Sequence, residues 1–579
     1  MKHSLKMSLK SRGEWILPEG KIEGDILNYL LKKRGIEDVE GYLSPSLKDI
    51  PSSSKLYDSQ RAAKEILSSV KKGEKIIIHG DFDSDGICAS SILWEFLYRD
   101  LATFLGQKID VIPYIPSRIE EGYGLTEDSL NSVLELGGKL LISVDCGVRD
   151  EQLIKKYMKG SKGKQPLKIV VTDHHQPPED LSEDLEYPLV HQMYPNHEYP
   201  YTQICGTAVA FLLIQEIKKQ VGMDFELTPE TKGLDLVAMA TITDIMPLVG
   251  INRIFVKYGL EQIRKRSRKG LNHLCLRAGI NPEDVNSYHL GYVLGPRINA
   301  AGRIGSPLDA VKLLVSNDDK LCQDIAEELE KLNFERQQLT TNTKEEALVL
   351  IGDVSKNNAI FVLGSEWHDG IIGLVAGKLQ EEYHRPVIVA TENRDSVKGS
   401  ARSISGFNIT EALGELSKYL ERYGGHELAA GFTAKKDLVN EFKEEFIKFA
   451  NKQIKKEQLI VRTEVDLVLN TSNITKRLIE QLSLLEPLGF KNPKPIICLQ
   501  DLVIVTKTVM GTEKNHLKLL VKGDGIDLLQ LVLFNVEDDI DVLEKDTVID
   551  VIGYPDINVW NNVESIQFKV KEWRFTEEN

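Results

Sequence analysis

Short apolar runs alternate with amphipathic segments along the first half of the chain, and each run ends in acids or histidines. The isoleucines at 76–78 lead into the acidic stretch 81–85, and the runs 139–144 and 168–172 end in the same way. Runs rich in β-branched residues predict strands, and apolar positions at helical spacing between them predict helices. Residues 59–316 therefore predict a parallel α/β sheet, whose strands bring their carboxyl ends to one edge.

The rest of the chain predicts further domains. Residues 317–347 form a charged segment without glycine or proline, which predicts a long connector helix. Strand and helix patterns return over 348–452, and short β-rich runs over 455–579 are typical of a small β-barrel such as an OB-fold. We expect residues 1–58 to be an N-terminal lead-in packed on the first domain. The predicted fold class is α/β: a parallel-sheet domain and a smaller α/β domain joined by the long helix, followed by the barrel.

Acidic and histidine side chains gather at the predicted edge of the first sheet. Asp244, which closes the apolar segment 234–242, is grouped with the strand ends. The candidate cluster is His79, Asp81, Asp83, Asp85, Asp145, Asp173, His174, His175 and Asp244. Carboxylates with a few imidazoles suit Mn²⁺ or Mg²⁺, whereas zinc prefers more nitrogen or sulfur ligands. This many ligands predicts two metal ions that activate water and neutralise a phosphoryl group, with Asp145 bridging them.

Each motif alone also has an ordinary structural interpretation. Alternating acids occur in solvated turns and in calcium loops, although the acid that an EF-hand needs farther along is absent after Asp85. Asp145 by itself could cap a helix. The conjunction of the motifs in one order, at the ends of successive predicted elements, favours the metal site.

Composition limits the class of protein. The chain has 579 residues, of which 42% are hydrophobic and 27% charged, which indicates roughly three to five globular domains. The net charge of −15 counts against nucleic-acid binding but leaves room for a locally basic groove, and the basic run 264–269 is either part of one or a solvated helix face. Six scattered cysteines fit a reducing cytosol. No apolar run is long enough to span a membrane, and the N-terminus lacks the apolar core of a secretory signal.

The order of these motifs resembles the DHH phosphoesterase superfamily, and Gly424-Gly425-His426 resembles the signature of its partner DHHA1 domain. At closer range, residues 116–125, 295–303 and 399–403 resemble the bacterial RecJ family, as does the order of DHH domain, connector helix, DHHA1 domain and OB-fold. One departure is Lys491, which stands where the family usually has glycine and which we expect to alter the turn leading into the barrel.

The resemblance implies an exonuclease that degrades single-stranded DNA from the 5′ end, releasing 5′-nucleotides by two-metal hydrolysis in DNA repair and recombination. Carried over by position, the implied metal ligands are His79, Asp81, Asp83, Asp85, Asp145, His174, His175 and Asp244. Asp81 either binds a metal directly or supports a residue that does, and Asp145 and His175 are the implied catalytic residues. The implied substrate-binding residues are Arg118, Arg303, Ser400, Arg402, Ser403, Gly425 and His426.

The expected cofactors are two divalent cations, Mn²⁺ or Mg²⁺, and the expected protein is a cytoplasmic monomer without membrane association. The expected partners are single-stranded DNA and, as candidates, a single-strand-binding protein and a helicase. An alternative is a DHH phosphodiesterase that acts on short oligoribonucleotides or cyclic dinucleotides, but the residues after 455 argue against it. A non-catalytic scaffold is a third hypothesis, which the full set of expected ligands argues against.

Overall fold

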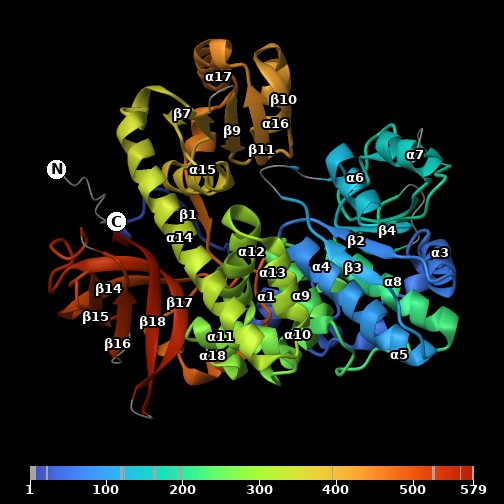
Figure 1. Ribbon diagram of the computed structural model, residues 1–579. Helices are drawn as coiled ribbons and strands as arrows, with labels where there is room; N and C mark the ends of the chain where they lie inside the picture. Colours follow the sequence, from blue (N-terminus) through green and yellow to red (C-terminus); the bar gives the residue numbers. More distant parts are fainter. Residues whose placement is uncertain are drawn as a thin grey trace. The chain divides into compact units, whose positions relative to one another are not determined.

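The computed structural model describes residues 8–20, 24–117, 121–122, 124–160, 165–182, 184–194, 199–393, 396–524, 528–536, 538–560 and 563–576. The chain forms two compact units (Figure 1). One unit combines residues 1–44, 454–486 and 493–579, and the other combines residues 45–453 with 487–492. In the described part of the chain, no helix has the length and apolar character needed to cross a bilayer.

A five-stranded parallel sheet organises the first domain of the larger unit. Its order is β3-β2-β4-β5-β6, formed by β3 (Val111–Tyr114), β2 (Ile76–Gly80), β4 (Leu140–Val144), β5 (Lys168–Thr172) and β6 (Leu189–Val190). Ile76 and Ile78 enter one hydrophobic core and Ile77 enters another, because successive strand residues point to opposite faces. Both faces are covered, which explains why the strand reads as an unbroken apolar run.

Helices cover the two faces of this sheet (Figure 1). Core residues on one face come from α6 (Glu127–Glu135) and α7 (Glu151–Lys159). Those on the other face come from α3 (Ser59–Lys71), α4 (Ser84–Glu95), α8 (Gly206–Val221), α9 (Leu234–Thr243), α10 (Gly250–Arg264), α11 (Lys269–Arg277) and α13 (Pro307–Val315).

The prediction that residues 234–242 end like the strands is wrong, because this segment is helix α9. Its residues from Leu234 to Thr241 are all buried. A helix surrounded on every side shows no amphipathic period, so its apolar run cannot be told from a buried strand by pattern alone. Asp244 follows the end of this helix.

The basic run 264–269 is not one helix face, and Lys265, Arg268 and Lys269 line a hollow of about 440 Å³. The run crosses the end of α10 and the start of α11. Arg268 is almost fully buried, and its guanidinium contacts Asp235 at 2.6 Å and Glu95 at 3.1 Å. Arg268 therefore serves the packing of the first domain, whereas Lys265, Arg266 and Lys269 are exposed.

The predicted long helix is α14 (Asp319–Ile351), which leads to the second α/β domain. Its sheet has the order β10-β11-β9-β8-β7, from β10 (Leu420–Gly425), β11 (Ala429–Ala434), β9 (Val397–Arg402), β8 (Val387–Glu392) and β7 (Ile360–Ser365). Only β7 and β8 pair in parallel. Helix α15 (Asp369–Tyr383) packs on one face through the core at Ile371, and α17 (Val439–Gln453) packs on the other through Phe442 against Phe361. A short helix α16 (Ile409–Glu415) precedes β10.

The smaller unit is a closed β-barrel, as predicted. Its strands are β13 (Leu467–Val468), β14 (Ile497–Met510), β15 (His516–Lys522), β16 (Leu528–Leu533), β18 (Val563–Phe575) and β17 (Val548–Trp560). Pairing of β14 with β17 closes the barrel. The fold class predicted from the sequence is therefore confirmed in its sheets, its long helix and its barrel.

The N-terminal residues are placed differently from the expectation that 1–58 pack together on the first domain. Strand β1 (Glu14–Ile16) pairs with β12 (Arg462–Glu464) in the smaller unit. The indole of Trp15 donates a hydrogen bond to Glu572 Oε2 at 2.8 Å, which anchors this strand. Helices α1 (Ile26–Lys33) and α18 (Lys476–Ser483) lie in the same unit. Leu47 and Leu56, by contrast, belong to the core of the first domain.

Candidate metal centre

The acidic loop after β2 is held by the first turn of α4. Asp83 is the N-cap of this helix, and its Oδ1 accepts hydrogen bonds from the backbone N–H groups of Asp85 at 2.9 Å and Gly86 at 3.2 Å. Acids are favoured at this position because the first N–H groups of a helix have no partner within it. The local sequence thus explains why the loop turns directly into a helix at the edge of the sheet.

Asp85 is buried, and the start of α8 holds its carboxylate. Its Oδ2 accepts from the N–H of Gly206 at 2.6 Å and its Oδ1 from the N–H of Thr207 at 2.7 Å. The two hydrogen bonds at the start of this helix therefore fix the position of the carboxylate. The Gly206-Thr207 pair was not identified from the sequence, because it lies far along the chain from the acid that it holds.

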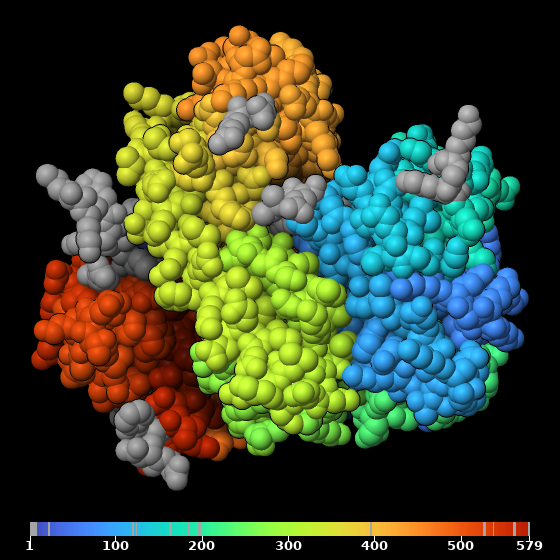
Figure 2. Space-filling model, in the orientation of Figure 1, coloured from blue at the N-terminus to red at the C-terminus, as the bar shows by residue number. Residues whose placement is uncertain are grey.

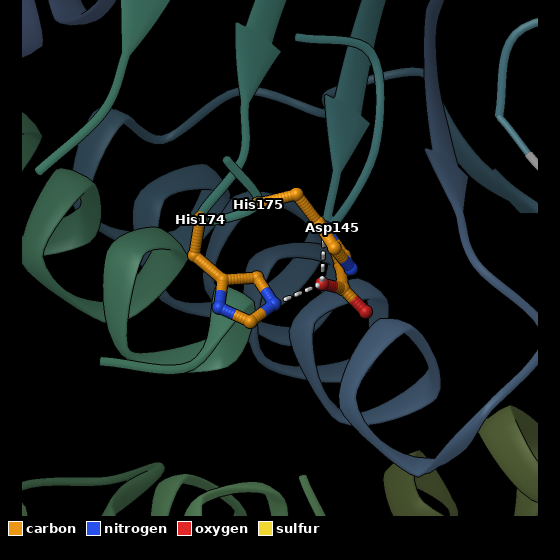
Figure 3. Close-up of side chains that lie close together, drawn as sticks. All are labelled: Asp145, His174 and His175. Atoms are coloured by element: carbon orange, nitrogen blue, oxygen red, sulfur yellow. Dashed lines mark ion pairs between the residues drawn. The ribbon is translucent and has the colours of Figure 1, made fainter. Parts of the chain in front are cut away.

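Asp145 and His174 meet at the centre of the cluster. Asp145 follows β4 in a left-handed conformation, with φ of 63°, and its N–H donates to the Thr172 carbonyl at 2.9 Å. His174 Nε2 lies 3.1 Å from Asp145 Oδ1, 3.5 Å from Asp244 Oδ2 and 3.8 Å from an oxygen of Asp85. Figure 3 shows the His174 ring directed at the Asp145 carboxylate, and the neighbouring His175 also lies beside it, with Nδ1 3.9 Å from Asp145 Oδ1.

Buried polar atoms meet at the centre of this cluster without a hydrogen bond. His174 Nε2, Asp145 Oδ1 and Asp244 Oδ2 are among them, and none of these three has a hydrogen-bond partner within the described residues. Unsatisfied buried polar atoms are costly and rare in folded proteins. Three such atoms that face one point therefore indicate the binding site of a ligand.

Asp173 holds the two histidines in place. Its Oδ1 accepts from the backbone N–H groups of His174 at 2.7 Å and His175 at 3.1 Å, and it lies 2.8 Å from His175 Nδ1. Its Oδ2 accepts from the N–H of Val148 at 2.9 Å. Burial raises the pKa of Asp173, but the hydrogen bond and charge of His175 outweigh burial and hold this pKa below its usual range. Asp173 is therefore an ionised residue that orients the histidines.

Three groups of side chains bring their ligand atoms close enough to hold an ion. These groups are Asp145 with His174 and His175, Asp85 with His174 and Asp244, and Asp81 with Asp83 and Asp145. Seven of the eight predicted ligands fall in at least one group. His79 falls in none: it is fully buried, its Nδ1 lies 3.6 Å from Cys146 Sγ, and its ring lies against Tyr114. Burial lowers the pKa of His79 to about 4. The ligand role of His79 stays a prediction.

The electrostatics of the cluster fit divalent cations. Burial and repulsion from Asp85, Asp83, Asp81 and Asp244 raise the pKa of Asp145 well above its ordinary value. Burial and the same kind of repulsion raise the pKa of Asp244. Burial lowers the pKa of His174, which leaves the neutral imidazole that a metal ion requires. Carboxylate oxygens with imidazole nitrogen match Mn²⁺ or Mg²⁺, and such ions remove the repulsion that the acids otherwise impose on each other.

A cleft of about 660 Å³ lies beside this cluster, and its lining comes from both sheets of the larger unit. The first domain contributes His175 and Arg149, and the second contributes Lys398, Arg422 and His426. In Figure 2 the surface is hollowed between the blue-to-cyan first domain and the orange second domain. The overall charge of the chain is negative, yet these side chains place cations at the cleft.

The predicted substrate-binding residues have different placements. Ser400, Gly425 and His426 line the cleft. Arg402 Nη1 donates to Ser400 Oγ at 3.1 Å, and Arg303 Nη1 donates to the Gly370 carbonyl at 3.0 Å.

Among the described residues, Arg303, Arg402 and Ser403 are not part of the cleft lining. Ser403 is buried and its hydroxyl donates to the Phe407 carbonyl at 2.6 Å, which gives it a structural contact. Arg118 lies outside the described residues.

Three cationic residues of the cleft were missed from the sequence. Arg149 follows Asp145 by four positions, and Lys398 comes just before the Gly399-Ser400 segment. Their closeness to recognised motifs was the available signal. Arg422 precedes Gly424-Gly425 in the same way.

Comparison with known proteins identifies three domains in this order. The profile of the DHH family, N-terminal domain, matches residues 75–241, that of the DHHA1 domain matches 355–456, and that of the RecJ OB domain matches 465–572.

Two curated relatives match almost the full chain. The single-stranded-DNA-specific exonuclease RecJ of Bacillus subtilis is 33% identical over 94% of this chain and 67% of the relative. The protein of the same name from Haemophilus influenzae is 30% identical over 95% of this chain and 94% of the relative.

Among solved structures, RecJ of Thermus thermophilus in complex with Mn²⁺ superimposes with a TM-score of 0.81 at 27% identity, covering 97% of this chain and 80% of that one. The same protein in complex with Mg²⁺ gives a TM-score of 0.76 at 26% identity, covering 97% and 79%.

Proposed function

This chain belongs to the RecJ family of single-stranded-DNA-specific exonucleases, and on that premise we propose that it removes 5′-nucleotides from the 5′ end of single-stranded DNA. It is a metal-dependent exonuclease, and its relatives bind Mn²⁺ and Mg²⁺. The observation that carries the chemistry is the convergence of His174 Nε2, Asp145 Oδ1 and Asp244 Oδ2, three buried atoms without a hydrogen bond in the described structure. The role in DNA repair and recombination is part of the same proposal.

The proposed ligands divide between two ions. One set of ligands is Asp85, His174 and Asp244, and the other includes Asp81 and Asp83. Asp145 lies close to ligand atoms of both sets, which suits the bridging role. His79 is retained as a predicted ligand. When bound, divalent cations supply Lewis acidity toward water and toward the oxygens of the scissile phosphate.

The side chains of the site have distinct tasks. The start of α8 fixes Asp85, and Asp173 fixes His175 through Nδ1 at the lining of the cleft. Burial lowers the pKa of His175, but the hydrogen bond and charge of Asp173 outweigh burial and raise it above its ordinary value. His175 therefore holds a proton where it can donate to a phosphate oxygen. Ser400 with Arg402, and Arg149 with Arg422, orient the strand by contacts with its phosphates.

The test is digestion of long single strands blocked at the 5′ or the 3′ end, with Mn²⁺ or with Mg²⁺, beside duplex DNA and a dinucleotide. We expect hydrolysis only of the single strand with a free 5′ end, and only with a divalent ion. Asp145→Ala abolishes the activity, whereas Asp110→Ala, an exposed acid on the same domain, retains it. Attack on the 5′-blocked strand would overturn the polarity, and turnover by Asp145→Ala would overturn the ligand assignment.

We also propose a cytoplasmic monomer that works with a strand-separating enzyme and a single-strand-binding protein. Such an enzyme has to supply the unpaired strand, and its product is the natural ligand of a single-strand-binding protein. The six cysteines are free thiols, as expected in a reducing compartment. Sedimentation of the purified protein, alone and with each partner, tests the monomer and both associations.

A further inference from the structure

Two tyrosines are exposed side by side on the larger unit, outside the residues assigned to the cleft. Tyr288 is 61% exposed and Tyr292 is 75% exposed. Their ring centroids are 5.1 Å apart and their planes differ by only 24°, so they present stacked faces to solvent. Single exposed apolar residues are common on protein surfaces and need no explanation. Two large aromatic rings that stack on each other and remain this exposed do not contribute to the core, so they suggest a binding surface.

The helix that carries these rings packs against one side of the metal cluster. Tyr288 precedes and Tyr292 lies within η5 (His289–Leu294), a π-helical segment that continues into α12 (Gly295–Ile304). Short π-helical segments recur at functional sites. A Cβ on Gly295 would lie 2.4 Å from Thr243 Cγ2, at the end of α9. The tyrosine-bearing helix is therefore in close contact with the turn that delivers Asp244.

The other end of the same helix holds the acidic loop. Asn299 Oδ1 accepts a hydrogen bond from the N–H of Ser84 at 2.7 Å, at the first turn of α4. A Cβ on Gly302 would lie 2.0 Å from the Phe82 carbonyl oxygen. The helix therefore contacts the metal cluster at two places. One is the end of α9, which precedes Asp244, and the other is the acidic loop at the start of α4.

Positions 288, 292, 296, 299 and 303 recur at helical spacing and are exposed or half-buried, whereas 290, 294, 298 and 301 are buried. From 292 to 299 the axial distance is about 10 Å at the α-helical rise. About three stacked nucleotides span that distance, at roughly 3.4 Å each.

We propose that Tyr288 and Tyr292 form a stacking platform for the bases of the DNA strand that continues beyond the scissile phosphate. Flat aromatic faces stack on every base, so they hold a single strand without reading its sequence. Single-stranded DNA is the occupant because the platform and the metal cluster are joined by one rigid helix within one compact unit. This inference rests on the proposed exonuclease function and adds a subsite to it.

The first test compares a long single strand with a dinucleotide that is too short to reach the platform. Each of Tyr288→Ala and Tyr292→Ala lowers the ratio of kcat/KM for the long strand to that for the dinucleotide by about tenfold, since stacking on one ring is worth about that factor in binding. Tyr288→Phe and Tyr292→Phe keep the ring and the wild-type ratio. Tyr98→Ala is the matched control, because Tyr98 is also exposed and stacked, on Trp94, at a different surface of the unit.

The second test reads stacking directly, with 2-aminopurine placed at successive positions of a long strand bound in EDTA. The fluorescence is quenched at the third to fifth bases in the wild type and recovers in the two alanine variants. Unchanged length discrimination together with unchanged fluorescence overturns the platform. If the wild type fails to degrade the long strand at all, the proposed function falls as well, so the two failures are distinguishable.

Discussion

Replacing Gly206 by alanine tests how α8 positions the metal cluster. A Cβ at this position would lie 2.7 Å from Asp145 Oδ1 and from Asp145 Cβ. An ordinary contact of this kind is near 3.5–4.0 Å, so α8 or Asp145 has to move by about 1 Å. The N–H of the same residue holds Asp85, so both carboxylates are disturbed together.

The expected loss has two components. Overpacking of a close-packed site costs about 1–3 kcal/mol of the free energy of unfolding. Displacement of residues that orient metal ligands costs about 10- to 100-fold in metal affinity. We therefore expect Gly206→Ala to lower the free energy of unfolding by about 2 kcal/mol and to weaken Mn²⁺ binding by at least about tenfold.

Urea denaturation in EDTA measures the first component, and calorimetric titration with Mn²⁺ measures the second. Gly377→Ala is the matched control, because Gly377 lies within α15 and a Cβ there would meet nothing within 4 Å. That control is expected to gain up to about 1 kcal/mol, since alanine favours helix. A folded Gly206→Ala protein that binds Mn²⁺ as tightly as the wild type would refute the role given to Asp145 and to the start of α8.

Three further predictions concern stability and reactivity. Lys491 has a φ of 61° in the turn where Gly489 pairs with Asn492, a left-handed conformation that glycine adopts without strain. Lys491→Gly is therefore expected to raise the free energy of unfolding by about 1 kcal/mol. An equal or lower midpoint of urea denaturation would contradict this. Arg268→Ala removes the cation that pairs with the buried Asp235, whereas Glu95 keeps its ion pair with Arg99, and we expect a cost of about 3–5 kcal/mol in the same unfolding curve, with exposed Arg277→Ala as the control. Burial raises the pKa of Cys275 and Cys498 to about 12, so these residues remain as unreactive thiols at pH 8. We expect them to react with a disulfide reagent only after urea unfolds the protein, and rapid labelling of the native protein would disprove this prediction.

The local pattern of apolar and polar residues was sufficient to predict the strands and most residues of the metal cluster. The short apolar runs at 76–78, 139–144 and 168–172 favour strands of a covered sheet, and the parallel strands bring their carboxyl ends to one edge. This is why Asp83, Asp145 and His174 could be grouped before any contact between them was known. Lys491 adopts a left-handed conformation, which glycine adopts easily, and the expected change of this turn relative to the family stays a prediction.

Only the tertiary structure decided which partners these side chains meet. The helical state of 234–243, the hold of Gly206 on Asp85, the burial of Ser403 and the pairing of Arg268 all depend on segments far apart in the chain. Periodicity encodes how strongly a residue is buried, but not which distant surface buries it, because that is set by the packing of whole elements. The sequence by itself therefore determined the elements and the acids that they carry. The packing of α8, α9 and α12 around the sheet edge decided how those acids become one site.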